Sequence, residues 1–305
     1  MDCLFLYNPC SGKGKINKYI KFITKNLAEK YDYVEVKAST KAGELSTLAS
    51  SACGKFDALF FAGGDGSFNE VLNGVAEQEV KPMLGYIPMG TVNDIGHSLS
   101  IPCKNVKKAL KKLLNGKEVF LDVMKINDKY AEYEIGAGAL LSCSYKAPRS
   151  EKIKFGKIAY GIEILRNNMK FDDFNIIVET QDKKIETNCE FLLFINSRSV
   201  AGMPINPQAV LDDGEIELII VKQVPKPKWY HKFLAFFHII SFFVIGYKNS
   251  NQSTYEKIKG AHFKIQVPEN IVWNFDGEEG IKGSVEISVL KRHIRVLVPN
   301  KKKRR

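Results

Sequence analysis

Short apolar runs alternate with amphipathic stretches along the first part of the chain, up to about Asp122. Apolar residues recur at helical spacing between and after these runs, which predicts helices over residues 16–27, 44–53 and 106–114. Strands that alternate with helices predict a parallel sheet covered on both faces. The runs short enough and apolar enough to form buried strands lie at residues 3–7, 33–38, 57–62 and 83–88.

The pattern changes after Asp122, where β-rich runs follow one another closely with turn residues between them. This spacing predicts a second, mostly antiparallel, sandwich-like domain. Two stretches of helical character interrupt it, near residues 156–167 and 228–247. The β-rich runs lie at residues 120–126, 130–138, 174–180, 189–197, 215–222, 262–267, 271–277, 284–290 and 294–299.

The length of 305 residues is sufficient for two domains, each with a core of its own. We expect an α/β domain over residues 1–122, completed by the segment 295–305, and a β-rich domain over residues 123–294. Hydrophobic residues make up 45% of the chain and charged residues 26%, which excludes an intrinsically disordered protein. The six cysteines form no C-x-x-C pair, so we expect reduced thiols of a cytoplasmic protein and no zinc site.

The formal net charge of +11 is the compositional signal that bears on a partner. A charge excess of this size favours an anionic partner, such as nucleic acid, an anionic bilayer or a phosphorylated small molecule. A basic surface that serves only solubility explains it equally well. Because the basic residues are dispersed and no nucleic-acid-binding module is recognisable, we do not expect nucleic acid as a partner.

The stretch FFAGGDGSFNE, residues 60–70, places three glycines around Asp65 directly after an apolar run. Glycines let the backbone turn tightly, and successive amides at a helix start form a concave site for an anion such as phosphate. A carboxylate repels phosphate, so Asp65 suits this loop only where a divalent cation or its water shell stands between them. The simpler alternative is an Asp-Gly turn without a ligand.

Two more polar, glycine-containing loops follow predicted strands. No Walker A motif is present, but open α/β sheets bind ligands beyond the carboxyl ends of their strands, where these loops would meet. Three such loops together favour a nucleotide phosphate site. The loop after the first strand supplies Asn8, Ser11, Gly12 and Lys13, and the loop after the fourth supplies Gly90, Thr91, Asn93 and Asp94.

The order of motifs resembles the soluble bacterial diacylglycerol kinases, which share an NAD-kinase-like fold and a superfamily with the eukaryotic diacylglycerol and sphingosine kinases. The resemblance extends over residues 3–299 and implies a two-domain lipid kinase with ATP bound in the cleft between the domains. Residues 1–122 would bind the nucleotide and residues 123–294 the lipid. The motifs are NPCSGKG, GGDGSFNEVLNG, IPMGTVND, the Asp122 of FLDV, NPQAVLDDGEIELIIV and FDGEEG.

The resemblance also implies roles for individual residues. Asp65, Asp94 and Asp122 would hold catalytic Mg²⁺, largely through water, and Glu278 would be the catalytic base. The family usually has threonine where this chain has Ser39 and Ser67, and the hydroxyl survives in both. The residues that would line the ATP are Asn8, Pro9, Cys10, Ser11, Gly12, Ser39, Gly64, Asp65, Gly66, Ser67, Phe68, Asn69, Glu70 and Thr91.

A second, structural Mg²⁺ is implied at Asp213, with the backbone carbonyls of Val210 and Glu215. Without the resemblance, the residues at this loop and at Glu278 have simpler explanations. The residues DDG at positions 212–214 fit a turn before a strand, and the DG before Glu278 fits the turn of an exposed hairpin. Lone aspartates beside glycines are commonly turn or cap residues.

The stretch at residues 228–248 bears on membrane binding. Its apolar part, residues 233–246, would span about 21 Å as a helix, less than the roughly 30 Å of a bilayer core. Trp229, Tyr230 and Tyr247 flank it together with lysines, as interfacial anchors do. We expect a helix that lies in the surface of an anionic membrane and makes the protein peripheral to it. The alternative is a buried helix of the second domain.

We therefore expect an ATP- and Mg²⁺-dependent lipid kinase that phosphorylates the hydroxyl of diacylglycerol to give phosphatidic acid. One alternative changes the acceptor to a sphingoid base, another lipid or NAD, although the apolar segment speaks against NAD. Another is a lipid-binding protein that uses the same fold without catalysis. The resemblance also makes a homodimer an expectation, and no separate sequence signature supports it.

Overall fold

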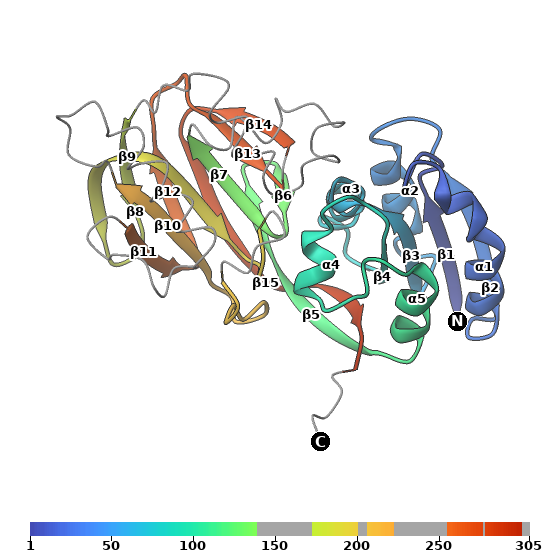
Figure 1. Cartoon of the computed structure of the whole chain (residues 1–305). Coiled ribbons are helices and arrows are strands. Elements are labelled where there is room, and N and C mark those ends of the chain that lie inside the picture. Colours follow the sequence, from blue (N-terminus) through green and yellow to red (C-terminus); the bar gives the residue numbers. More distant parts are fainter. Residues whose placement is uncertain (139–172, 201–205, 223–254, 277, 301–305) are drawn as a thin grey trace. The chain divides into compact units, whose positions relative to one another are not determined.

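The computed structural model describes residues 1–138, 173–200, 206–222, 255–276 and 278–300, and of Glu278 and Glu279 it describes the backbone only (Figure 1). The chain forms two compact units. Unit 1 is Met1–Val123 with Lys291–Arg305, and unit 2 is Met124–Leu290.

Unit 1 is built on a parallel sheet with the strand order β4-β3-β1-β2. The part of β15 that belongs to unit 1 pairs in parallel with β4, through Val296 and Leu84. Every residue of β3 and β4 is buried, which explains why these strands read as continuous apolar runs. The strands are β1 (Asp2–Tyr7), β2 (Tyr33–Ala38), β3 (Ala58–Gly63) and β4 (Met83–Pro88).

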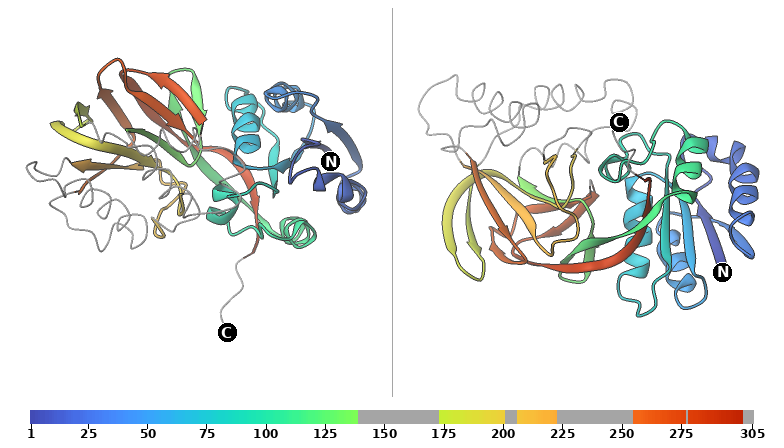
Figure 2. Two further views of the ribbon diagram at one scale, coloured as in Figure 1. Left: turned by 45° about the horizontal axis from the view of Figure 1, so that its top comes forward. Right: turned by 90° about the horizontal axis from the view of Figure 1, so that it is seen from below.

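Helices cover both faces of this sheet (Figures 1 and 2). The step from β1 to β2 moves along the sheet in one direction, and the steps from β2 to β3 and from β3 to β4 move in the other. Because parallel crossovers are right-handed, the helix of the first step lies on the opposite face from the helices of the other two. Accordingly α1 contacts α5, and α2 contacts α3. The helices are η1 (Lys15–Lys18), α1 (Ile20–Ala28), α2 (Glu44–Ala52), α3 (Asp65–Val75), α4 (Asp94–Ser98) and α5 (Val106–Leu114).

Unit 2 is all β in its described residues, and its strand pairs are antiparallel. The order is β14-β13-β7-β9-β8-β12-β15, and β10 pairs with both β9 and β11. Strands β5 and β15 each contain a unit boundary. The strands are β5 (Lys117–Ile126), β6 (Lys129–Ala131), β7 (Glu134–Gly138), β8 (Phe174–Glu179), β9 (Lys184–Ile195), β10 (Ile216–Lys222), β11 (Tyr255–Gly260), β12 (His262–Gln266), β13 (Val272–Phe275), β14 (Glu278–Lys282) and β15 (Val285–Val298).

An aromatic cluster marks the core of unit 2. The rings of Phe194 and Phe263 meet edge to face with centroids 5.0 Å apart, and Trp273 lies 6.5 Å from Phe194. The indole nitrogen of Trp273, which is fully buried, donates to the carbonyl of Gly283 at 2.7 Å. The packing therefore buries the large apolar area of tryptophan without leaving its N–H group unpaired.

The predicted fold class, an α/β domain with a mostly parallel sheet followed by a β-rich domain, is confirmed. Two predicted strands, at residues 284–290 and 294–299, are assigned to one strand, β15; the polar residues between them include Arg292, whose φ of 51° marks a local irregularity in the strand. The predicted helix over residues 16–27 begins as the 3₁₀ turn η1 before α1, as is frequent at helix starts. The predicted helices near 156–167 and 228–247 lie outside the described residues.

Candidate functional site

The strand order of unit 1 reverses direction at β1. From β1 the chain moves to β2 on one side, and β3 and β4 lie on the other side. A reversal of this kind opens a crevice beyond the carboxyl ends of the strands, where open α/β sheets bind their ligands. The three loops singled out in the sequence follow β1, β3 and β4 at this edge (Figure 1).

Glycines allow the strand-end loops to approach one another closely. A Cβ atom at Gly64 would lie 3.1 Å from the Cα of Gly90, so the loops after β3 and β4 meet through their backbones. A Cβ atom at Gly12, in the loop after β1, would lie 3.0 Å from the side-chain Cε of Met89, which follows β4. A side chain at Gly64 would push the loops after β3 and β4 apart, and one at Gly63 would clash with Ser67 of α3, 2.3 Å away.

The loop after β1 is a tight turn. The backbone nitrogen of Cys10 donates to the side-chain oxygen of Asn8 at 2.8 Å, and the nitrogen of Ser11 donates to the Asn8 carbonyl at 2.9 Å. Gly12 and the two residues after it have φ values of 60°, 60° and 77°, a run of left-handed backbone. Ser39 follows β2 beside this loop, where it is buried and its nitrogen donates to the carbonyl of Tyr7 at 2.9 Å.

Asn93 closes the loop after β4. Its side-chain oxygen accepts from the nitrogen of Gly90 at 2.7 Å, and its side-chain nitrogen donates to the Gly90 carbonyl at 2.9 Å. Its φ of 56° lies in the left-handed region, which asparagine tolerates better than most residues. This closure leaves Thr91 exposed at the tip of the loop. Asn93 was recognised as a polar loop residue, but its closing role could not be predicted.

Asp65 and Asp94 are brought together by the starts of two helices. Asp65 begins α3, Asp94 begins α4, and an oxygen of Asp65 accepts from the nitrogen of Ile95 at 3.3 Å. The pKa of Asp65 is raised to about 7, mainly by desolvation and secondarily by the negative charge of Asp94, and hydrogen bonds from the backbone at the start of α4 offset part of this rise. A half-buried carboxylate beside the buried carboxylate of Asp94, each repelling the other, is a suitable environment for a cation.

The third predicted aspartate is held by different contacts. Asp122 lies on β5, is fully buried, and accepts from the backbone nitrogen of Arg292 on β15 at 2.6 Å. All three side chains carry the hard oxygen donors that Mg²⁺ takes, and Asp65 and Asp94 are the two that the structure brings together; a Mg²⁺ ion held by them would keep several of its waters. Within the part of the chain that the structure describes, no group of three or more His, Cys, Asp and Glu side chains surrounds a common point.

The first turns of α3 carry the other predicted nucleotide residues. The side chain of Phe68 is buried among Phe61 and Tyr86, with ring centroids 5.5 and 5.3 Å away, so its contribution to a ligand would come from its backbone. Glu70 accepts from the nitrogen of Leu45 at the start of α2, at 3.2 Å. The remaining predicted residues of this segment are Gly66, Ser67 and Asn69, all half-buried.

In unit 2 the predicted base lies at a hairpin. Phe275 of β13 pairs with Glu278 of β14, and the turn between them contains Asp276 with a φ of 49°. The Asp276 carboxylate is buried and accepts from the backbone nitrogens of residues 132, 133 and 134 at 3.0, 3.1 and 3.0 Å. A hairpin is therefore present, as the simpler alternative had it, but its turn residue Asp276 is buried rather than exposed and fixes the turn. The side chain of Glu278 lies outside the described part of the chain.

The loop predicted to hold a structural Mg²⁺ contains an internal cation. The ammonium of Lys259 lies 2.7 Å from one oxygen of Asp213 and 2.9 Å from the carboxylate of Glu215. The other oxygen of Asp213 accepts from the nitrogen of Glu215 at 3.1 Å. Both carboxylates are thus paired with a cation of the chain itself, and a Mg²⁺ ion held by Asp213 and the carbonyls of Val210 and Glu215 stays a prediction.

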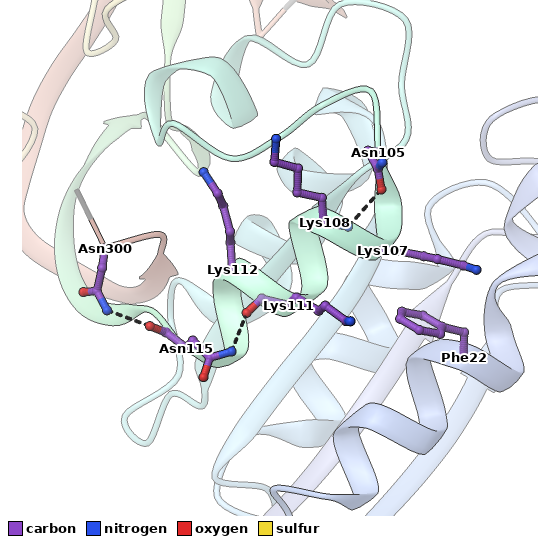
Figure 3. Close-up of a pocket in the computed structure, with 8 residues that line it drawn as sticks. All are labelled: Phe22, Asn105, Lys107, Lys108, Lys111, Lys112, Asn115 and Asn300. Carbon is purple, nitrogen blue, oxygen red and sulfur yellow. Dashed lines mark hydrogen bonds between the residues drawn. The ribbon is translucent and has the colours of Figure 1, made fainter. Parts of the chain in front are cut away.

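A basic hollow of about 670 Å³ lies on the outer side of α5 (Figure 3). Lys107 and Lys111 extend toward Phe22 of α1, and the Lys107 ammonium lies 5.3 Å from the ring centroid. Lys108 and Lys112 extend to the other side of the helix. The sequence offered a signal in the lysine spacing of NVKKALKKLLN, but the hollow itself was not predicted. Its other lining residues are Asn105, Asn115 and Asn300.

Comparison with known proteins decides the family. The pattern of the diacylglycerol kinase catalytic domain matches residues 2–126, and that of the YegS C-terminal NAD kinase beta sandwich-like domain matches residues 142–298. A diacylglycerol kinase of Staphylococcus aureus (strain MRSA252) is 34% identical over 301 residues, covering 97% of this chain and 91% of the relative. The chain belongs to the diacylglycerol kinase family.

Other diacylglycerol kinases agree with this assignment. That of Bacillus subtilis (strain 168) is 29% identical over 299 residues, covering 97% of this chain and 96% of the relative. A solved structure of a diacylglycerol kinase from Bacillus anthracis has a TM-score of 0.76 at 21% identity, covering 97% of this chain and 96% of its own, and shares the fold. Family membership identifies a lipid kinase, which implies ATP as the phosphate donor and a lipid as the acceptor.

The lengths and hydropathy of the described helices bear on whether the chain crosses a membrane. Among the residues that the structure describes, no helix is both long and apolar enough to cross a bilayer. The segment 228–248, predicted to lie in the membrane surface, falls outside those residues.

Proposed function

We propose that the chain is an ATP- and Mg²⁺-dependent kinase that phosphorylates the hydroxyl of diacylglycerol to give phosphatidic acid. The observation that carries this proposal is the meeting of three strand-end loops beside the half-buried Asp65 and the buried Asp94, in a chain of the diacylglycerol kinase family. The lipid oxygen forms a bond to the γ-phosphorus of ATP, the bond from that phosphorus to the bridging oxygen breaks, and ADP leaves.

The loops supply the groups that grip a triphosphate. The start of α3, from Gly64 to Ser67, would present the first backbone amides of the helix, where negative charge is favoured, whereas the amides of Cys10 and Ser11 are used inside the turn after β1. Ser11, Ser39, Ser67 and Thr91 lie in or beside these loops and can donate hydroxyl hydrogen bonds. Phosphoryl transfer is catalysed mainly by positioning and charge stabilisation, and both come from this edge of the sheet.

Three aspartates would hold the metal. Asp65, Asp94 and Asp122 carry the carboxylates, with water completing the coordination. When bound, Mg²⁺ neutralises the charge that develops on the phosphate oxygens. The mutual repulsion of Asp65 and Asp94 supports this role, because a cation near them stabilises the ionised form of both.

Glu278 is the proposed general base. It accepts the proton of the lipid hydroxyl as the oxygen attacks phosphorus. The clamp of Asp276 on three backbone amides supports this role, since it fixes the turn directly before Glu278. The β-rich unit would bind the lipid, while unit 1 binds the nucleotide.

The proposal includes a peripheral position on an anionic membrane. The net charge of +11 and the lysine-lined hollow on α5 support electrostatic attraction to anionic lipid. The segment 228–248 would add apolar burial, and two weak attractions together give reversible docking. The family resemblance adds a homodimer, which light scattering of the purified protein tests.

Transfer of labelled phosphate tests the proposed reaction. With ATP and Mg²⁺, the protein should phosphorylate diacylglycerol in mixed micelles, and Asp65→Asn and Glu278→Gln should each lower kcat by about 100-fold or more. Asp128→Asn serves as the control: it removes an exposed carboxylate in a turn and should keep full activity. The mechanism would be wrong if both site variants retained full turnover.

A panel of acceptors tests the substrate. Diacylglycerol should be preferred over a sphingoid base, other lipids with a free hydroxyl, and NAD. Preference for another acceptor would keep the kinase and replace the substrate. Binding of ATP without transfer to any acceptor would instead indicate a lipid-binding protein on the kinase fold.

A further inference from the structure

The loop before β10 is tied to β11 by one lysine. Strands β10 and β11 are antiparallel partners, and Glu217 of β10 stands opposite Lys259 of β11. From β11, the Lys259 ammonium reaches past the strand end to Asp213 at 2.7 Å and Glu215 at 2.9 Å. One cation thus joins two carboxylates of a loop that lies 44 to 46 positions earlier in the chain.

Each oxygen of the Asp213 carboxylate accepts a hydrogen bond from the chain. One oxygen accepts from the lysine, and the other accepts from the nitrogen of Glu215, which closes the turn around Gly214 with its φ of 88°. A hard divalent cation seeks six or more oxygen ligands around one point. An ammonium group needs only three acceptors, and two of them are supplied here.

We infer that Lys259 supplies the cation that holds this loop, in place of the divalent ion that the family resemblance implies there. A metal ion would have to displace an ammonium that the chain itself holds close to both carboxylates. The loop before β10 is therefore folded without a metal, whatever Mg²⁺ does at the aspartates of unit 1. The inference does not rest on the proposed kinase reaction.

The same strand offers a matched control. Lys257 lies two residues earlier on β11, where it points to the same face and pairs with Glu217 at 3.5 Å. The two lysines have similar exposure, with 30% and 42% of the side chain accessible. Lys257→Met removes the same charge and length as Lys259→Met, but leaves Asp213 and Glu215 paired.

Thermal unfolding of the nucleotide-free, full-length protein in EDTA and in rising Mg²⁺ tests the inference. Any change of the wild-type Tm with Mg²⁺ should be independent of Asp213, so the Asp213→Asn variant should show the same change. Lys259→Met should lower the Tm by about 2 to 4 °C and make it rise again with Mg²⁺, because two unpaired carboxylates then become available. Lys257→Met should acquire no such Mg²⁺ response.

A second variant keeps the test decisive if Lys259→Met does not fold. Lys259→Arg retains the positive charge and should stay as insensitive to Mg²⁺ as the wild type. The inference would be overturned if EDTA lowered the wild-type Tm, Mg²⁺ restored it, and Asp213→Asn abolished this response. It would also be overturned if Lys259→Met and Lys257→Met behaved alike.

Discussion

Asp65 resolves an apparent conflict in the glycine-rich loop, where a carboxylate stands in a site built for an anion. Its carboxylate accepts from the backbone at the start of α4, so it joins two helix starts that the sequence separates by about thirty residues. The negative charge of Asp94 beside it adds repulsion. The structure thus holds two mutually repelling carboxylates at this edge, and a bound cation would favour the ionised form of both, whereas the protein without metal favours a proton on Asp65.

The pH dependence of stability should reveal this proton. The pKa of Asp65 is raised from 3.8 to about 7, so between these values the folded protein binds a proton that the unfolded protein releases. The stabilising contribution is complete below pH 4 and is lost as the pH rises through 7. Between pH 5 and 8, the Tm of the metal-free protein should fall by several degrees, on the order of 5 °C, because of this group.

Differential scanning fluorimetry in EDTA measures this effect, and Asp65→Asn provides the comparison. The variant cannot titrate at this position, so its Tm should change less over the same pH range. Asp128→Asn removes an exposed carboxylate and should retain the pH dependence of the wild type. Parallel pH curves for the wild type and Asp65→Asn would show that the carboxyl titrates normally in the folded protein.

At the scale of elements, local pattern was sufficient for unit 1. The predicted ranges 33–38, 83–88 and 106–114 coincide with β2, β4 and α5, since β2 alternates apolar and charged residues from Val34 on, β4 is a continuous apolar run, and α5 has a clear helical period. In unit 2, β11 and β14 were not predicted, because each contains only one or two apolar residues among charged ones and glycine. A half-buried strand carries only half of the apolar residues that a buried one carries.

The contacts that organise the candidate site show a similar limit. The loops themselves were recognisable from glycine and polar residues after strands, which are local features. The clamp of Asp276 joins residues separated by 142 to 144 positions, and Lys259 reaches a loop 46 positions away. Such pairs leave no periodic trace in the sequence, so only the folded chain reveals them.

The hairpin β13–β14 yields a prediction about positioning. Asp276→Ala removes the acceptor of three buried amide hydrogen bonds, so the free energy of unfolding should fall by about 2 to 4 kcal/mol. Since the turn directly precedes Glu278, kcat should fall while the KM for ATP stays near the wild-type value. Urea unfolding and steady-state kinetics measure the two effects.

Asp276→Asn separates the clamp from simple loss of stability. It keeps the shape of the side chain and one acceptor oxygen. Compared with Asp276→Ala, it should therefore recover part of the unfolding free energy and part of kcat. The alkaline side of its pH–rate profile should be flattened to the same extent as in the alanine variant, or less. A variant that lost stability but kept full kcat would show that the turn has no role in placing the base.

At the scale of the whole molecule, the position of the charge matters more than its sum. Helix α5 buries Val106, Ala109, Leu110 and Leu113 and turns four lysines outward, so its charge is concentrated on one face. Each lysine near an anionic bilayer contributes about 1 kcal/mol to attraction. The four lysines of α5, at positions 107, 108, 111 and 112, therefore form the surface expected to contact anionic lipid.

Replacing these four lysines by glutamine should lower binding to vesicles that contain phosphatidylglycerol by at least about tenfold, with little effect on helix stability. Co-sedimentation measures the binding, which should weaken with salt and be absent on phosphatidylcholine vesicles. The charge-matched control replaces the exposed lysines 41, 55, 129 and 183. If both variants lost binding equally, total charge rather than α5 would govern docking. If neither variant lost binding, the segment 228–248 would have to supply the attraction alone.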